Sequence, residues 1–244
     1  MPLLYLGFFD PLYLVLLLPG LLIAAWAQAK VRGAFARYER VTTRARLTGA
    51  EVARMILKAN GQSDVEVERI GGLLSDHYDP TRKVVRLSPQ VYDSPSVAAL
   101  GVAAHETGHA LQHADNYAPL QLRTALVPAV QFGSNLAWIF LLGGVVLATV
   151  TGAVGLGKLA ILTGIALFSV AVVFSLVTLP VEINASQRAL ALLTHTGVLT
   201  TEEGVGARDV LRAAAYTYVA AALVAILQLL YYVIRFLPFL SSDE

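Results

Sequence analysis

Four apolar segments, each about as long as a bilayer is thick, limit what this chain can fold into. They cover residues 11–29, 126–150, 159–179 and 213–234. A helix needs about 20 mainly apolar residues to cross the hydrocarbon core of a membrane. The sequence therefore predicts a mainly α membrane protein with four transmembrane helices.

Composition agrees with a chain that lies largely in lipid and excludes several classes of function. Hydrophobic residues make up 56% and charged residues 14% of the sequence, whereas soluble domains have about 25% charged residues. The formal net charge is only +1, so nucleic acid is not an expected partner. The chain has no cysteine, which leaves His and carboxylate side chains as the ligands for any metal.

The positions of the basic residues predict the orientation of the segments. Asp10 precedes the first apolar run, and Lys30 and five arginines follow it, the reverse of a secretory signal peptide. We expect an uncleaved anchor with its N-terminus outside and the following loop in the cytoplasm. All but two of the 18 Lys and Arg residues then lie inside, the exceptions being Lys158 and Arg235. The expected location is the cytoplasmic membrane, with several spans.

Residues 105–109 form an H-E-x-x-H motif in a segment typical of a helix. On a helix His105 and His109 are about 6 Å apart along the axis, so both imidazoles can face one ion. Glu106 is offset by about 100° and can lie beside that ion without binding it. A carboxylate so placed can take a proton from a zinc-activated water and later give it to a leaving amine. The motif predicts a zinc-dependent peptidase with Glu106 as the catalytic base.

Ser94 and Pro95 are typical of a helix start, so the motif helix should run from there to about His113. Its histidine face carries further residues that are expected to leave room for an ion and a substrate: Ala98, Gly101, Gly108 and Gln112. The alternative is a buried helix whose histidines make only structural hydrogen bonds. Burying two histidines and a glutamate without partners would be costly, which disfavours that alternative.

The segment before the motif predicts a small α+β fold. Thr48 should cap an amphipathic helix over residues 49–59, and alternating apolar and polar residues predict strands over 65–70 and 83–87. The edge of the strand over 83–87 is a candidate surface for binding an extended substrate.

Catalytic zinc usually takes three protein ligands plus water, so one ligand should come from outside the motif. The candidates are Glu182, His113, His77, His195 and the carboxylates of the first loop. His113 would lie about 12 Å along the helix from His105, too far to share one tetrahedral ion.

Glu182 follows the third apolar run, so a hairpin of two spans would return it to the side of the motif. A carboxylate at the membrane boundary has few structural reasons to be there, although a solvated glutamate at a helix start is the alternative. Pro180 is expected to interrupt the helix of the third apolar run just before Glu182.

Two stretches together resemble a known family. Residues 103–112 (AAHETGHALQ) and 179–189 (LPVEINASQRA) are similar to the YugP-like family of neutral membrane zinc metallopeptidases, as are residues 76–80 and 86–88. The resemblance covers most of residues 47–235. That family is itself similar to the HtpX and CAAX-type membrane proteases, in which H-E-x-x-H supplies two zinc ligands and a base and a later Glu supplies the third ligand.

The resemblance implies one Zn²⁺ per chain, held by His105, His109 and Glu182, with Glu106 as the base. Ser186 stands where the related proteases have Asp. The hydrogen bond to a ligating histidine is therefore expected to be weaker or to come from elsewhere.

Other residues could stabilise the oxyanion of a tetrahedral intermediate, because that step needs a neutral or cationic donor. Arg188 and His77 are the first choices, and Tyr78 and His195 are the others. An ordinary structural hydrogen bond is the alternative for each of them.

We predict a small cytoplasmic α+β zincin-like metallopeptidase domain attached to the four transmembrane helices. The expected partners are the lipid bilayer and peptide or membrane-protein substrates. Two alternatives are an intramembrane protease with the motif helix in lipid and a non-catalytic scaffold with a structural zinc. The expected parts are an anchor (1–29), the zincin-like domain (30–125), a transmembrane hairpin (126–181), a cytoplasmic helix with the third ligand (182–212), and a final transmembrane helix and tail (213–244).

Overall fold

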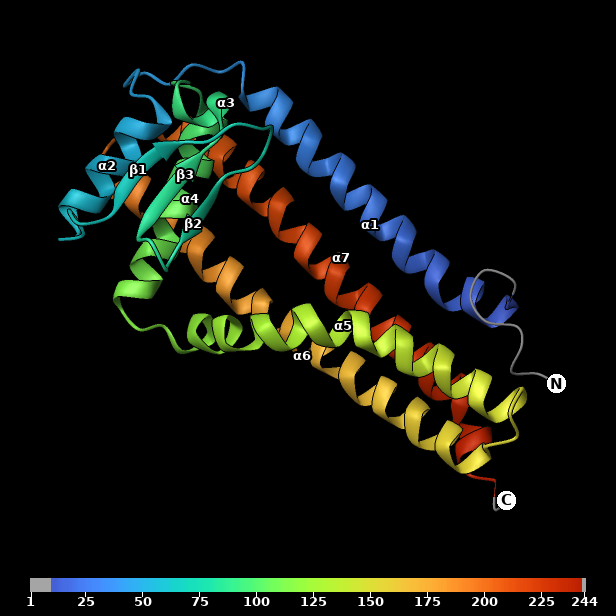
Figure 1. Cartoon of the computed structure of the whole chain (residues 1–244). Coiled ribbons are helices and arrows are strands. Elements are labelled where there is room, and N and C mark those ends of the chain that lie inside the picture. The colour runs from blue at the N-terminus through green and yellow to red at the C-terminus, as the bar shows by residue number, and fades with distance from the viewer. Residues whose placement is uncertain (1–9, 243–244) are drawn as a thin grey trace. The chain divides into compact units, whose positions relative to one another are not determined.

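The computed structural model describes residues 10–242 as a mainly helical chain with one three-stranded sheet (Figure 1). Residues 1–9 and 243–244, which belong to the expected anchor and tail, lie outside the described residues. The elements in chain order are α1 (Pro11–Tyr38), α2 (Gly49–Ala59), β1 (Glu66–Arg69), β2 (His77–Asp79), β3 (Val84–Leu87), α3 (Pro89–Tyr92), α4 (Val97–Ala114), α5 (Ala118–Thr149), α6 (Val154–His195) and α7 (Thr201–Leu240).

The chain divides into two compact units. The first, here called the apolar unit, comprises residues 10–26, 122–178 and 218–242 of the described chain. The second, here called the site unit, comprises Ala27–Gln121 and Leu179–Thr217. Both the H-E-x-x-H motif and Glu182 belong to the site unit.

Four helices within residues 10–242 are long and apolar enough to cross a membrane, namely α1, α5, α6 and α7. The prediction of four spans is confirmed at this level of length and composition. Three of these helices, α1, α6 and α7, extend well past their apolar runs into the site unit. The same helices therefore build parts of both units.

Pro180 does not interrupt α6, contrary to the sequence prediction. The helix continues from Val154 to His195 with Pro180 inside it. A proline in a helix interior costs about 3 kcal/mol because it removes a hydrogen bond and crowds the preceding turn. Burial of the residues that follow, Val181 and Ala185, offsets this cost, since both are fully buried. Glu182 thus lies within a long helix and not at a helix start.

Small residues let α5 and α6 approach closely in the apolar unit. A Cβ atom added at Gly144 would lie 2.8 Å from the carbonyl oxygen of Gly157, and one added at Gly157 would lie 2.7 Å from that of Gly144. Transmembrane helices associate through such small residues because lipid offers no hydrophobic drive for helix contact. A core from α1, α5, α6 and α7 completes this unit: Leu17, Leu141, Val145, Ile161, Tyr231, Tyr232 and Phe236.

The sheet of the site unit has the order β1-β3-β2, with β1 parallel and β2 antiparallel to β3. The two strands expected over 65–70 and 83–87 are present as β1 and β3, whereas β2 was not predicted. Because β3 is the central strand, both of its edges are already paired. The idea that it binds an extended substrate at a free edge is therefore wrong.

The helix starts of the site unit are set by capping side chains. As predicted, Thr48 caps α2, and its hydroxyl and the carboxylate of Glu51 form a reciprocal capping box. The motif helix α4 begins at Val97 and not at Pro95, because Ser96 is the cap and its hydroxyl accepts a hydrogen bond from the backbone N–H of Ala99 at 3.2 Å. Its predicted end near His113 is confirmed to within one residue.

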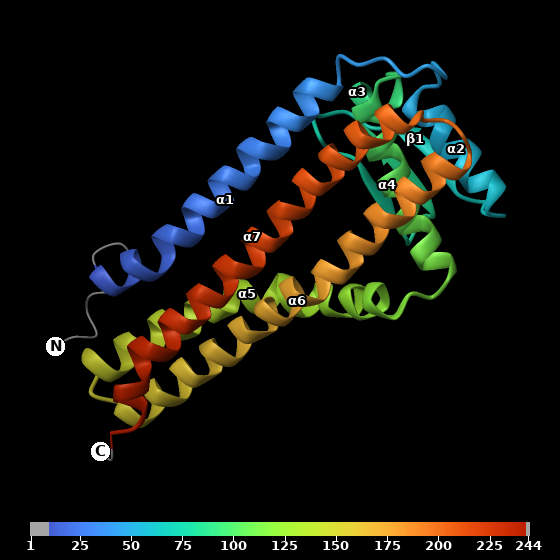
Figure 2. The same ribbon diagram turned by 180° about the vertical axis from the view of Figure 1, so that it is seen from behind.

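Helix α4 is the centre of the site unit, with 14 of its 18 residues buried. One core cluster joins it to α1, α2, α3, α7 and the sheet, and a second joins it to α2, α6 and α7. Figure 2 shows the backbones of α2, α3, α6 and α7 near α4. A Cβ atom added at Gly108 would lie 2.8 Å from the carbonyl oxygen of Ala185, and one at Gly101 would lie 3.7 Å from the Cβ of Ala207. These small residues make room for α6 and α7, and not for an ion and a substrate as the sequence suggested.

Candidate metal centre

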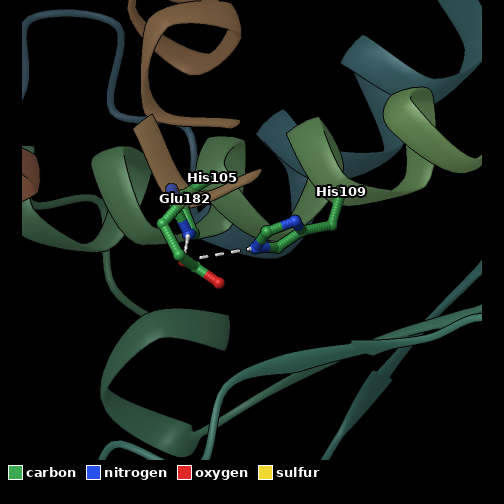
Figure 3. A group of neighbouring side chains, drawn as sticks. All are labelled: His105, His109 and Glu182. Carbon is green, nitrogen blue, oxygen red and sulfur yellow. Dashed lines mark hydrogen bonds and ion pairs between the residues drawn. The ribbon is translucent and has the colours of Figure 1, made fainter. Parts of the chain in front are cut away.

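Three side chains converge at the contact between α4 and α6 in the site unit (Figure 3). The carboxylate oxygen Oε2 of Glu182 lies 3.2 Å from Nε2 of His105 and 3.6 Å from Nε2 of His109. Candidate ligand atoms of all three residues lie within 4.8 Å of one another. The side chains are only 12%, 10% and 3% exposed for His105, His109 and Glu182. Two candidate ligands from one helix and one from another are thus gathered around a shared point.

The spacing of these atoms fits a tetrahedral zinc ion. Zinc binds His nitrogen and carboxylate oxygen at about 2.0–2.2 Å. Two such ligands around a tetrahedral ion are roughly 3.3–3.5 Å apart, close to the 3.2 and 3.6 Å found here. Imidazole and carboxylate are also donors that zinc commonly takes.

Gln112 fixes which nitrogen of His109 faces Glu182. The side-chain amide nitrogen of Gln112 donates to the carbonyl of Val181 at 2.8 Å and to the side-chain oxygen of Asn184 at 2.9 Å. The amide oxygen Oε1 therefore faces Nδ1 of His109, at 3.0 Å, and Nδ1 must carry the proton. In a neutral ring Nε2 then presents its lone pair.

While the ring is neutral, this lone pair faces a carboxylate oxygen, so a proton or a metal cation is needed between the two acceptors. Burial alone would lower the pKa of the His109 imidazole, but the hydrogen bond to Glu182 and the charges of Glu106 and Glu182 outweigh it. They hold the pKa of His109 above its ordinary value. The site is thus set to take up positive charge, and a divalent metal ion supplies it for all three residues at once.

Ser186 provides the hydrogen bond to a histidine whose source the sequence did not identify. Its hydroxyl lies 3.1 Å from Nδ1 of His105, one helical turn beyond Glu182 on α6. A hydroxyl can accept the Nδ1 proton as a carboxylate would, but without its charge. The hydrogen bond that orients His105 therefore comes from Ser186 itself, as a neutral contact.

Glu106 lies next to the group without joining it. Its residue is 9% exposed, and among residues 10–242 no hydrogen bond or ion pair to its carboxylate is found. A carboxylate that makes no hydrogen bond or ion pair to these residues keeps both oxygens available for a water or a proton.

His113 lies outside the group, as helix geometry predicted. Its Nδ1 lies 2.8 Å from the hydroxyl of Tyr78, and it is half-buried instead of lying on the surface. Burial raises the pKa of Tyr78 to about 12, so the phenol stays protonated and can act as the donor. This pair ties β2 to the end of α4.

The other candidates make contacts of their own outside the group. Arg188 donates to Asn184 at 2.9 Å and forms an ion pair with Asp115. His77 donates from Nδ1 to the carbonyl of Ser75 at 2.8 Å, and its Nε2 lies 3.5 Å from Arg86. His195 is exposed at the end of α6. A role for any of them at the oxyanion stays a prediction.

Residues 76–88 near the sheet have clear structural contacts. Asp76 accepts hydrogen bonds from the backbone and the hydroxyl of Ser88, at 2.7 and 3.0 Å, which joins β2 to the start of α3. Burial raises the pKa of Asp76. Asp79 accepts from the hydroxyl of Thr81 and from Arg86, and these contacts lower its pKa to about 2.

Comparison with known proteins also points to a zinc-binding protein. Residues 13–237 match the model of a family described as "Putative neutral zinc metallopeptidase". The chain belongs to this family. It is also 48% identical to the "Putative membrane protease YugP" of Bacillus subtilis (strain 168) over 226 residues, which cover 93% of this chain and 97% of that protein. No solved structure matches the chain. Membership of a zinc metallopeptidase family implies Zn²⁺, and the buried group of His105, His109 and Glu182 could hold such an ion.

Sequence reasoning missed Gln112 as a positioning residue. It was placed on the histidine face only as a residue that leaves room. Its spacing of three from His109 is a weak signal, because many polar residues lie one turn from a histidine. The decisive contacts to Val181 and Asn184 span 69 and 72 residues of sequence.

We predict that Gln112→Leu lowers zinc affinity about 10- to 100-fold, the range typical for residues that orient a metal-bound histidine. The leucine cannot hold the Nδ1 proton of His109, so the ring is free to turn. Asn184→Ala removes one partner of Gln112 but leaves its contact to His109, so its effect should be smaller. Zinc affinity is measured by competition with a chelator, and melting temperatures of the apo proteins report on folding. Unchanged zinc affinity in a folded Gln112→Leu protein would contradict the role.

Proposed function

We propose that this chain is a zinc-dependent endopeptidase of the cytoplasmic membrane that hydrolyses peptide bonds at the cytoplasmic face with a metal-activated water. The arrangement of four side chains supports this proposal most directly. His105, His109 and Glu182 gather around a point that suits zinc, and the carboxylate of Glu106 lies beside them without a partner among the described residues.

Each residue then has a separate task. His105, His109 and Glu182 hold the metal, and Gln112 and Ser186 keep the two rings turned toward it. A zinc ion held there would supply Lewis acidity, which would lower the pKa of a water toward about 7. Glu106 takes the proton from the attacking water and returns it to the leaving amine, so its carboxylate is unchanged after one turnover.

The number of ligands supports an enzyme over a structural zinc scaffold. Structural zinc sites are closed by four protein ligands, whereas catalytic sites have three and leave one position open. Within residues 10–242, the group that could hold a metal has three members. A scaffold would also have no use for a buried carboxylate that is not a ligand.

The surroundings of α4 support a site outside the hydrocarbon core over an intramembrane protease. Helix α4 is not among the four candidate spans found in the described chain. It packs against the sheet and α2. Strands of an open sheet and the loops between them are not exposed to lipid, because their backbone groups would lack hydrogen-bond partners there. We therefore place the site in a cytoplasmic zincin-like domain formed by residues 30–125 and 182–212.

The base is tested by Glu106→Gln. Glutamine has nearly the same shape but cannot accept the proton, so we expect cleavage to fall by about 10²- to 10⁴-fold while zinc content is retained. Cleavage of a fluorescently labelled unfolded protein and metal analysis of the same preparation measure the two effects. Glu202→Gln, at the exposed start of α7, is the matched control and should be fully active. Near-normal activity of Glu106→Gln would disprove the assigned role.

The third ligand is tested by comparing Glu182→Ala with His113→Ala. We expect Glu182→Ala to lower zinc affinity as strongly as His105→Ala does, because each change removes one of three ligands. His113→Ala should bind zinc nearly normally, since it loses only the contact to Tyr78. Zinc titration of the purified full-length variants measures the difference. The site would need to be redrawn if Glu182→Ala bound zinc normally and His113→Ala did not.

The cytoplasmic orientation is tested with single cysteines, because the chain has none of its own. Ser63, Gly155 and Ser241 are exposed positions on different segments. An impermeant thiol reagent added to sealed cells should label cysteines at Gly155 and Ser241 but not at Ser63. Labelling of all three after lysis is the control for accessibility. Labelling of Ser63→Cys in sealed cells would reverse the proposed topology.

A further inference from the structure

The site unit contains a second feature that has no part in the metal centre, a pocket between α1 and α7. Its volume is about 460 Å³, within the roughly 300–1,000 Å³ of small-molecule pockets. The walls combine small, aromatic and charged residues: Ala29, Lys30, Gly33, Ala34, Arg37, Tyr38, Asp209, Arg212, Ala213 and Tyr216.

The charged residues of this pocket are mostly cationic. Lys30, Arg37 and Arg212 stand against a single carboxylate, that of Asp209. This carboxylate accepts a hydrogen bond from the hydroxyl of Tyr38 at 2.9 Å. The guanidinium of Arg212 lies over the ring of Tyr216, 5.9 Å from its centroid. The pocket therefore has an excess of positive charge and several donors, which suits an anion.

The pocket lies where both of its helices change from apolar to polar sequence. Lys30 directly follows the apolar run 11–29, and Arg212 directly precedes the apolar run 213–234. Lys and Arg at the cytoplasmic ends of spans, together with tyrosine, are typical of the membrane interface. The anion most available at that level is the phosphate of an acidic lipid.

We propose that this pocket binds the phosphate of an anionic phospholipid headgroup. Basic pockets between transmembrane helices at the cytoplasmic side recognise acidic headgroups through charge and hydrogen bonds. A phospholipid also has acyl chains that can follow the apolar runs of α1 and α7, which free phosphate lacks. The proposal is independent of the peptidase function, because none of the pocket residues belongs to the metal centre.

Two contacts that do not involve Arg37 or Arg212 join the walls of the pocket. Tyr38 of α1 lies against Gly206 of α7, where an added Cβ would be 2.6 Å from its ring. The hydrogen bond from Tyr38 to Asp209 adds a polar tie between the same helices. Neutralising Arg37 and Arg212, both exposed, should therefore leave the fold intact.

The charge test uses two double variants of the full-length protein in detergent. Arg37→Gln with Arg212→Gln removes two pocket charges. Arg32→Gln with Arg208→Gln removes two exposed charges from the same helices that do not line the pocket. The shift of the melting temperature is recorded against increasing phosphatidylglycerol, and against phosphatidylcholine and phosphatidylethanolamine with the same acyl chains. Inorganic phosphate is the fourth additive.

We expect phosphatidylglycerol to stabilise the native protein and the control variant. The pocket variant should need about fivefold more lipid for each charge removed, about 25-fold for both. The proposal is wrong if phosphatidylcholine or phosphatidylethanolamine stabilises equally well, if both double variants lose the response equally, or if neither does. A shift of equal size with inorganic phosphate would make this a site for free phosphate and would also overturn the proposal.

A steric test keeps every charge in place. Gly33 lines the pocket, and a Cβ atom added there meets nothing within 4 Å. Gly33→Leu should therefore fill the pocket and weaken the phosphatidylglycerol response without lowering the melting temperature of the lipid-free protein. Gly155→Leu, where an added Cβ also meets nothing within 4 Å, is the matched control and should respond as the native protein does. A full response in Gly33→Leu would contradict the proposed location.

Discussion

The close contact of α4 with α6 at Gly108 is the feature on which the metal centre depends. A side chain at Gly108 would meet the carbonyl of Ala185 at 2.8 Å, so only glycine allows the two helices to come this near. Ala185 follows Glu182 by almost one helical turn, and His105 and His109 flank Gly108 on α4. The same contact therefore brings His105 and Glu182, 77 residues apart in the sequence, to 3.2 Å.

Burial makes this arrangement selective for a cation. A carboxylate that is taken out of water without a counter-charge costs several kcal/mol, and Glu182 is almost completely buried. Gln112 turns the proton of His109 away from Glu182, so the two acceptors cannot satisfy each other while the ring is neutral. A metal ion bound there would neutralise Glu182 and accept the lone pairs of both histidines, which would explain how these polar groups are stable in a buried part of the site unit.

The sequence predicted the parts of the site that follow from local geometry or from counting membrane crossings. Helical spacing placed His105 and His109 together and excluded His113, and the number of apolar runs allowed Glu182 to reach them. The faces of α4 were harder to assign, because buried small residues look the same whether they adjoin a substrate or another helix. Gln112 and Ser186 act through contacts to distant helices, and Pro180 is outweighed by packing. Neither effect has a local signal in the sequence.

Helix α6 also links the proposed chemistry to the membrane. The apolar run 159–179 ends three residues before Glu182, which is about 5 Å along a helix axis. Because α6 continues through Pro180 without a break, the apolar run and Glu182, the proposed third ligand, belong to one helix. This short distance along the chain favours, among the proposed substrates, membrane proteins whose cleaved bond lies close to the lipid surface.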